Sequence, residues 1–187
     1  ISGERALEYG FTGPNLRAAG VDYDVRVMTP YSSYEDFDFI IPIGTQGDTY
    51  DRFCVREEEM WQSLSIIRQA LDKMPKTNEF FADVPEFYLP PKDAVYNTME
   101  GLIWHFKIVM GEVNVPKGQV YHCVEGGNGE LGFYLVSDGG RQPFRLHFRR
   151  PCFIYYQAYP EMIKGALLSD AIITMSSMNV IAGELDA

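Results

Sequence analysis

Apolar side chains recur with a helical period near the middle of the chain. The spacings along this stripe are four, three, four and three residues, which places its members on one face of an amphipathic helix. Three glutamates at 57–59 are expected in the first turns, where carboxylates favour the positive end of the helix dipole. Pro75 is expected to end the helix. The stripe consists of Met60, Leu64, Ile67, Leu71 and Met74.

A second stripe with the same rhythm predicts a helix that begins near Asp93, a candidate N-cap, and ends before Gly111. Residues 78–92 contain three prolines and are expected to form a loop between the two helices. The members of this second stripe are Val95, Met99, Leu102, Phe106 and Val109.

From Gly118 the apolar period changes to two, and glycine-bearing turns separate three segments. These predict three strands, Gln119–Val124, Glu130–Ser137 and Phe144–Arg149. Two short helices are expected within 1–19, and further helical segments over 159–165, 167–180 and 182–187. The predicted fold is α+β, a single domain over residues 1–187 that is mainly α-helical with a small antiparallel three-stranded β-sheet.

Residues 20–52 hold no helical period and are rich in Asp, Arg and Tyr. Irregular segments this long more often carry a function than serve only as connections. Two interpretations of the charges stay open: internal ion pairs and caps that hold the loop in shape, or a surface that fixes a partner subunit or lines a polar channel. The residues concerned are Arg17, Asp22, Asp24, Arg26, Asp48, Asp51 and Arg52. The basic side of the third strand, with Arg145, His147 and Arg149, is either a solvated face or an anchor for an acidic partner.

The amino-acid composition limits the classes of partner that we expect for this chain. Sixteen Lys and Arg against 26 Asp and Glu give a net charge of −10, and so acidic a surface repels phosphate backbones, so no nucleic-acid partner is expected. No apolar run reaches the roughly 18–20 residues that span a bilayer, so any membrane association is expected to be peripheral. Because the chain starts at Ile1, we expect it to be a piece of a longer protein.

No catalytic or metal-binding residue is predicted. The three cysteines form no Cys-x-x-Cys pair and lack the spacing to histidine that metal sites use, so Cys54, Cys123 and Cys152 are expected to be buried thiols. The sequence also lacks a Gly-x-Ser-x-Gly motif and a dinucleotide-binding fingerprint. We therefore expect that the chain is not an enzyme by itself.

Several long motifs lie between and within the predicted elements. They are the segment 10–26, which opens with Gly-Phe-Thr-Gly-Pro-Asn-Leu-Arg, the run Gly-Asp-Thr-Tyr-Asp-Arg at 47–52, the hairpin segment 125–139 and the segment 143–151. Together with Gly-Glu-Leu-Asp near the end, they resemble the D subunit of proton-pumping NADH:quinone oxidoreductase, respiratory complex I. The resemblance runs from about Gly3 to Ala187 and covers roughly the C-terminal half of the family chain.

This resemblance implies a fold like the large subunit of nickel–iron hydrogenase, with no metal in this chain. In the family, this chain packs against an iron–sulfur subunit that carries the terminal [4Fe-4S] cluster, and together they form the pocket where quinone takes electrons. The resemblance thus implies quinone at a shared site, other peripheral-arm subunits as partners, and a peripheral location on the cytoplasmic side of the bacterial inner membrane. The family's headgroup histidine and tyrosine lie upstream of this segment, which implies that the chain alone is not catalytic.

The family's C-terminal segment runs beside the cluster and the quinone cavity. By resemblance, the cavity-facing and cluster-facing residues are Met178, Asn179, Val180, Gly183 and Glu184. Loop shaping and partner contact are assigned to Arg17, Arg26, Asp48, Asp51 and Arg52.

Three positions depart from the family pattern. Ala166 stands in place of a histidine, Asn179 in place of an aspartate and Ala187 in place of the C-terminal arginine. Asparagine keeps hydrogen bonding but loses the charge. Two alternatives to the complex I subunit stay open: a homologue of the membrane-bound hydrogenase large subunit, and a non-catalytic assembly or scaffold homologue, which Asn179 and Ala187 favour. The first would need a C-terminal cysteine pair that this sequence lacks.

Overall fold

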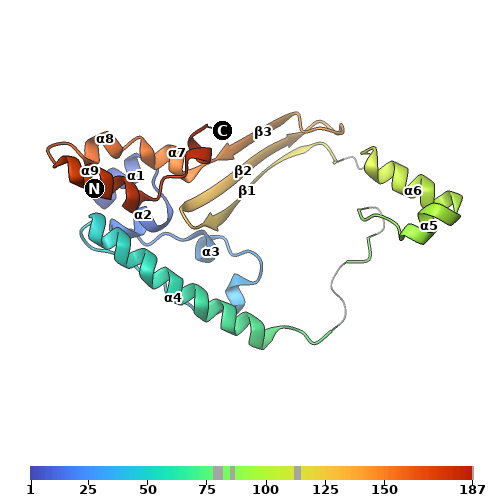
Figure 1. The fold of residues 1–187 in the computed structure, drawn as a ribbon, viewed down its shortest axis with the longest axis horizontal. Coiled ribbons are helices and arrows are strands. Elements are labelled where there is room, and N and C mark those ends of the chain that lie inside the picture. The colour runs from blue at the N-terminus through green and yellow to red at the C-terminus, as the bar shows by residue number, and fades with distance from the viewer. Residues whose placement is uncertain (78–81, 85–86, 112–114, 187) are drawn as a thin grey trace. The chain divides into compact units, whose positions relative to one another are not determined.

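A computed structural model describes residues 1–77, 82–84, 87–111 and 115–186 (Figure 1). These residues form two compact units. The first comprises Ile1–Met74, His122–Phe133 and Phe148–Ala187, and the second comprises Pro75–Tyr121 and Tyr134–His147. The helices and the three-stranded sheet agree with the predicted α+β class. The prediction of a single domain over 1–187 stays a prediction.

The first unit opens with short helices that end at tight turns. They are α1 (Gly3–Glu8), α2 (Gly13–Ala18), α3 (Val25–Met28) and the 3-10 helix η1 (Tyr34–Asp36). The side chains of Ser2 and Asp24 accept hydrogen bonds from backbone N–H groups in the first turns of α1 and α3, which satisfies donors that a helix leaves free. The two helices predicted within 1–19 are confirmed, whereas α3 and η1 lie in a segment that was expected to be irregular.

The long helix α4 (Thr49–Lys73) begins two turns before the predicted start. The Asp48 side chain accepts a hydrogen bond of 2.8 Å from the Asp51 N–H and so forms the N-cap. The glutamates at 57–59 therefore do not lie in the first turns, and this part of the prediction was wrong. The capping aspartate decided the start, because it satisfies free N–H groups that the apolar period does not reveal. The helix ends before Pro75 as predicted.

The C-terminal part of the first unit is built from four short helices. They are α7 (Pro151–Tyr156), α8 (Tyr159–Met162), α9 (Leu168–Met178) and α10 (Ala182–Asp186). The sequence pattern missed α7, whose run of aromatic residues has no 3.6-residue period, although Pro151 is suited to its first turn. Figure 1 shows α1, α2, α7, α8 and α9 grouped beside the first turns of α4. Ala187 lies outside the described residues.

The core of the first unit lies among these short helices. Phe11 and Tyr155 pack edge to face with ring centroids 5.9 Å apart, and Met178 at the end of α9 is fully buried against the same cluster. The remaining fully buried members of the cluster are Ala6, Leu16, Cys152 and Ala158. The core therefore joins α1 and α2 to α7 and α9, which are more than a hundred residues apart in sequence.

The second unit contains two helices in place of the single predicted one, α5 (Lys92–Asn97) and α6 (Met99–Val109). Thr98 takes an extended conformation between them, and its side chain accepts a hydrogen bond of 3.1 Å from the Gly101 N–H. Asp93 lies inside α5 and is not an N-cap, so that prediction was also wrong. Gly111 follows the end of α6 with φ +77°, as expected for a C-terminal glycine. Part of the loop predicted over 78–92 lies outside the described residues.

The sheet consists of β1 (Gly118–Gly126), β2 (Gly129–Ser137) and β3 (Arg145–Arg149), hydrogen-bonded in the order β1-β2-β3. All three strands were predicted from the period of two. The turn between β1 and β2 lies against the start of α2. A Cβ atom on Gly13 would lie 2.3 Å from the Gly129 Cα, so the backbones at these two glycines meet where only glycine fits. The Thr12 hydroxyl accepts a hydrogen bond of 3.0 Å from the Glu130 N–H at the same place.

Candidate functional site

The irregular region predicted to carry chemistry is organised around one buried arginine. The side chain of Arg17, on α2, is 1% exposed. Its guanidinium lies 2.6 Å from Glu59 on α4, 2.8 Å from Glu125 on β1 and 3.2 Å from Asp24. It also donates to the Tyr23 carbonyl over 2.9 Å. One side chain therefore joins α2, α4, β1 and the loop before α3.

The electrostatics of this cluster favour the charged arginine. Burial by itself would lower the pKa of Arg17, but the negative charges of Glu125, Glu59 and Asp24 outweigh burial and raise it. The pKa of Asp24 is lowered, because hydrogen bonds and charge from Arg26 and Arg17 exceed the effect of burial. Burial raises the pKa of Glu125 in spite of Arg17. Arg26 bonds to Asp24 over 2.6 Å and adds a second cation.

Two predicted aspartates hold the loop that precedes α4. Asp48 caps the helix, and Asp51 Oδ2 accepts hydrogen bonds from the backbone N–H groups of residues 45–47, at 2.8, 2.5 and 3.3 Å. The bonds from Gln46 and Thr45 lower the pKa of Asp51. Both carboxylates therefore bind the backbone of their own loop.

Arg52 points into the protein from the first turns of α4 and is 3% exposed. It donates to the Ser177 hydroxyl over 2.9 Å, to the Gly47 carbonyl over 3.2 Å and to the Thr49 hydroxyl over 2.9 Å. Burial lowers its pKa to about 10. Arg52 thus links the loop-shaping residues to the end of α9, where the C-terminal candidates begin.

The predicted C-terminal candidates differ in exposure. Met178 is fully buried, and its carbonyl accepts from the Asn15 amide over 3.3 Å. Asn179 ends α9 in the left-handed conformation, with φ 55°, and its amide donates to the Asn128 side chain over 2.7 Å. Val180 packs against the edge of the core. Glu184 accepts from the Cys152 N–H over 2.8 Å, whereas a Cβ on Gly183 would have nothing within 4 Å.

A thiol and a phenol meet beneath this segment. The Cys152 Sγ lies 2.8 Å from the Tyr155 hydroxyl, which also donates to the Asn179 carbonyl over 3.3 Å. Burial raises the pKa of both Cys152 and Tyr155, so both stay protonated at neutral pH. The prediction of buried thiols holds for Cys152, but Cys54 and Cys123 are half-buried. Within the described ranges, no three His, Cys, Asp or Glu residues are grouped so that they could hold a metal ion.

The structure brings only part of the predicted set together. Arg52 contacts Ser177, next to Met178, while Arg17 and Arg26 belong to the carboxylate cluster farther along α4. Sequence reasoning missed Arg56 and Asn128, which bond to residues 177–179. The signal available for Arg56 was its position four residues after Arg52, on the same face of a helix. The functional roles assigned to these residues stay predictions.

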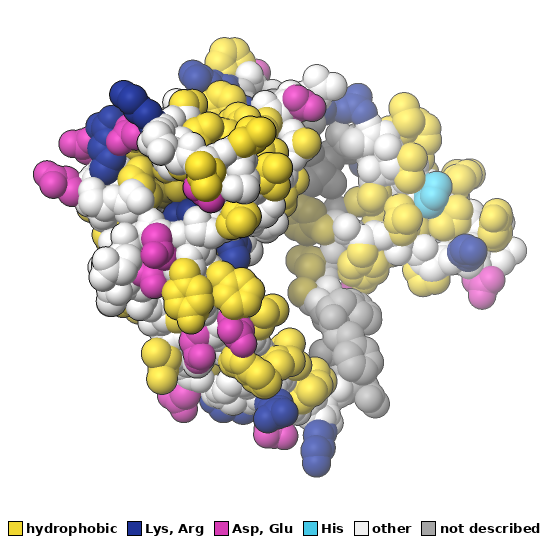
Figure 2. Space-filling view, turned by 60° about the vertical axis from the view of Figure 1, so that its left-hand side comes forward, with side chains coloured by type: hydrophobic (Ala, Val, Ile, Leu, Met, Phe, Trp, Pro, Cys, Tyr) yellow, Lys and Arg dark blue, Asp and Glu magenta, His cyan; other side chains and the backbone are white. Residues whose placement is uncertain are grey.

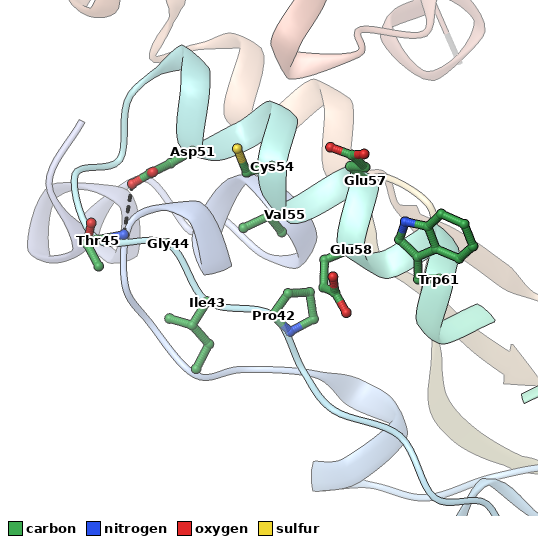
Figure 3. A pocket seen from close by; sticks show the side chains of 10 residues that line it. All are labelled: Pro42, Ile43, Gly44, Thr45, Asp51, Cys54, Val55, Glu57, Glu58 and Trp61. Atoms are coloured by element: carbon green, nitrogen blue, oxygen red, sulfur yellow. Dashed lines mark hydrogen bonds between the residues drawn. The ribbon is translucent and has the colours of Figure 1, made fainter. Parts of the chain in front are cut away.

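A cleft of about 530 Å³ lies between the loop at 42–45 and residues 51–61 of α4 (Figure 3). Its acidic side chains are Glu57, Glu58 and Asp51, the last of which bonds to the Thr45 N–H. Pro42, Ile43 and Trp61 supply apolar surface. None of the predicted C-terminal residues lines this cleft, so it is separate from the candidate segment at 178–184.

Comparison with known proteins gives consistent matches along the chain. The sequence profile of a family described as "Respiratory-chain NADH dehydrogenase, 49 Kd subunit" matches residues 1–187. The NADH-quinone oxidoreductase D subunit of Flavobacterium johnsoniae is 77% identical over 187 residues, which are 100% of this chain and 45% of that protein. The second D subunit of Cytophaga hutchinsonii is 75% identical over 190 residues, 100% of this chain and 48% of that protein. The D subunit of Leptospira biflexa is 60% identical over 186 residues, 100% of this chain and 46% of that protein. The chain spans about half the length of the curated relatives it matches.

Proposed function

Because the chain belongs to the family of the 49 kDa subunit of respiratory-chain NADH dehydrogenase, we propose that it works as part of an NADH:quinone oxidoreductase. It forms part of the wall of the quinone cavity and part of the interface with an iron–sulfur subunit. In this role it supports electron transfer from NADH to quinone, coupled to proton translocation. The observation that carries the proposal is the family match over all of residues 1–187.

The exposed apolar surface supports a role inside a larger assembly. The four stripe residues on α4, and Met74 directly after it, are between 48% and 63% exposed. Hydrophobic side chains are prominent beside acidic ones on the face seen in Figure 2. Contiguous apolar surface on a folded chain is typical of protein–protein contact. The proposed partners are an iron–sulfur subunit with a [4Fe-4S] cluster and other subunits of the peripheral arm.

The proposed cavity wall is the segment with Met178, Asn179, Val180, Gly183 and Glu184. Its first residues are held by the core, while Gly183 leaves open space beside the backbone, so a neighbouring group can approach closely. This combination of a fixed backbone and an open side suits a binding wall. No metal is assigned to this chain, and the fold we propose is that of the nickel–iron hydrogenase large subunit.

The proposed location is peripheral, on the cytoplasmic side of the bacterial inner membrane. None of the helices in the described part of the chain is long and apolar enough to cross a bilayer. Membrane association would therefore come from the partner subunits rather than from these helices.

A segment exchange tests the proposal. This chain replaces the matching segment of the D subunit in Flavobacterium johnsoniae, whose identity of 77% favours correct assembly. The tagged assembly is purified, and NADH oxidation is measured with a short-chain quinone and with ferricyanide, an artificial electron acceptor. We expect the purified chimera to contain an iron–sulfur subunit and to reduce quinone at a rate comparable to the unaltered assembly.

The controls separate the alternatives. An assembly whose D subunit lacks the segment should yield no quinone activity. A fully assembled chimera that reduces ferricyanide but not quinone would favour the scaffold alternative. Hydrogen production from reduced methyl viologen by the assembly would favour the hydrogenase alternative.

A further inference from the structure

Arg56 on α4 binds three backbone carbonyls that belong to two distant segments. Its guanidinium donates to the Met178 carbonyl over 3.2 Å and to the Gly127 carbonyl over 3.0 Å, with a longer contact of 3.4 Å to the Ser177 carbonyl. The first and third acceptors are the last carbonyls of α9, and the second lies in the turn between β1 and β2. One planar side chain therefore holds the end of α9 and the hairpin turn at a fixed separation.

The charge of Arg56 suits this position. The last carbonyls of a helix have no partners within the helix and carry partial negative charge, so a cation there is favourable. The ion pairs of the described residues involve Arg5, Arg17, Arg26 and Arg149 but not Arg56. Burial lowers the pKa of Arg56, and the opposing electrostatic effects of Tyr155, Glu59 and Cys152, in that order, are smaller than the effect of burial. The carbonyl groups are thus its direct partners.

Asn179 forms a second tie between the same two segments. Its amide donates to the Asn128 side chain in the hairpin turn over 2.7 Å, and its backbone has φ 55°. Asn15 adds a bond of 3.3 Å to the Met178 carbonyl from α2. Residues 177–179 are therefore fixed from both sides, and two of them, Met178 and Asn179, begin the segment proposed as cavity wall.

We propose that Arg56 is a positioning residue for quinone reduction, which sets the placement of residues 178–184 by holding the end of α9 against the hairpin turn. This inference rests on the proposed function of that segment. Arg56 acts through backbone carbonyls and need not touch quinone. A guanidinium can reach three acceptors in one plane, whereas the single ammonium of lysine cannot, so the role depends on arginine rather than on positive charge alone.

The test uses the purified chimeric assembly that carries Arg56→Gln. We expect the KM for a short-chain quinone to rise about tenfold, with kcat changed much less, because the wall is displaced while the upstream electron path is intact. NADH oxidation by ferricyanide and subunit composition should stay unchanged. Amide hydrogen exchange of residues 178–184 should become faster. Arg68→Gln, at an exposed position on the same helix, is the matched control and should change none of these quantities.

Two further variants sharpen the test. Arg56→Lys should assemble and still show the raised KM, and Arg56→Gln with Asn179→Ala should raise the KM by more than the product of the single effects, because both side chains tie the same segments. Unchanged KM and exchange in Arg56→Gln would overturn the inference. Loss of assembly in both Arg56→Gln and Arg56→Lys would overturn it too, since the role would then be general folding.

If the proposed function is wrong, the measurements would give a different result from the ones that overturn the role of Arg56. In that case the chimera with no substitution would already lack quinone activity. The exchange of residues 178–184 would still report whether Arg56 fixes this segment.

Discussion

The two halves of α4 use their side chains in opposite ways. In the first half, residues 49–59, the side chains that point into the protein include the charged Arg52, Arg56 and Glu59, each with a partner from another segment. In the second half, residues 60–73, the apolar stripe that a globular helix normally buries is about half exposed. The first half of the helix therefore turns charged side chains toward partners within the chain, whereas the second half leaves an apolar stripe half exposed.

This difference separates two kinds of stabilisation. The first half is held by charges and hydrogen bonds within the chain, and removing one partner would leave others buried without compensation. The second half offers apolar surface whose burial would stabilise a complex rather than the isolated chain. Substitutions in the two halves should therefore affect folding and assembly separately.

The largest effect on folding is expected for Arg17→Met. The substitution leaves Glu59, Glu125 and Asp24 without their shared cation, and breaking a buried ion pair in this way costs about 3–5 kcal/mol. Urea unfolding of the chain, followed by far-ultraviolet circular dichroism, measures the free energy of unfolding. Arg68→Met, on the exposed side of α4, is the control. A loss below about 1 kcal/mol would mean that the cluster does not hold the first half of the helix.

A moderate effect is expected for Asp48→Ala, which removes the N-cap of α4. The lost hydrogen bond to the Asp51 N–H should lower the free energy of unfolding by about 1 kcal/mol. Asp72→Ala, near the other end of the same helix and exposed, should change it by less than about 0.5 kcal/mol. If the two substitutions lowered the free energy of unfolding equally, the Asp48 cap would stabilise the helix no more than an exposed residue near its other end does.

Asp51→Asn should have an effect that depends on pH. The folded-state pKa of Asp51 is lowered below its unfolded value of about 3.8 by hydrogen bonds from Gln46 and Thr45, so the unfolded chain binds more protons as the pH falls. Its contribution is present above the unfolded pKa and is lost as the pH falls through the folded pKa. The gap in urea midpoint between parent and variant should thus be widest at neutral pH and narrow below about pH 4. A gap of constant size across this range would contradict the assignment, and Asp72→Asn serves as the control.

The smallest effect on folding is expected for the double substitution Leu64→Ser and Ile67→Ser in the second half of α4. Both side chains are already about half exposed, so each should change the free energy of unfolding by no more than about 0.5 kcal/mol. Assembly should nevertheless suffer. The tagged chimera with both substitutions should recover fewer partner subunits than the parent, whereas Arg68→Gln should recover the full set. A large loss of stability with intact assembly would reverse the comparison.

Local rules predicted the parts of the fold that depend on neighbours in sequence. The strands followed from a period of two, the end of α4 from Pro75, and the end of α6 from Gly111, because each depends on residues a few positions apart. Prediction from the apolar period failed where a single side chain caps a helix at a position that the period does not mark. Asp48 moved the start of α4, and Thr98 divided the second predicted helix, in both cases by accepting a backbone hydrogen bond.

The candidate site could be predicted only in outline. The family resemblance selected 178–184, and the density of charge selected Arg17 and Arg52, but neither indicates which groups meet. Arg17 and Glu125 are 108 positions apart, and the Arg56 carbonyl partners are 71 to 122 positions away. Pairings at such separations depend on how the helices and the hairpin pack, so no spacing rule reaches them.

The helical and strand periods, the acidic charge and the motifs that mark the family can all be read from the order of the residues. Packing in three dimensions was needed to show that charged side chains of α4 face inward and that its apolar stripe is exposed. It was also needed to show that Arg56 and Asn179 hold the hairpin turn against the end of α9. The physical reason is that periodicity indicates a face of a helix but not what lies against that face. A buried charge is stable only where distant segments supply its partners, and only packing brings them there.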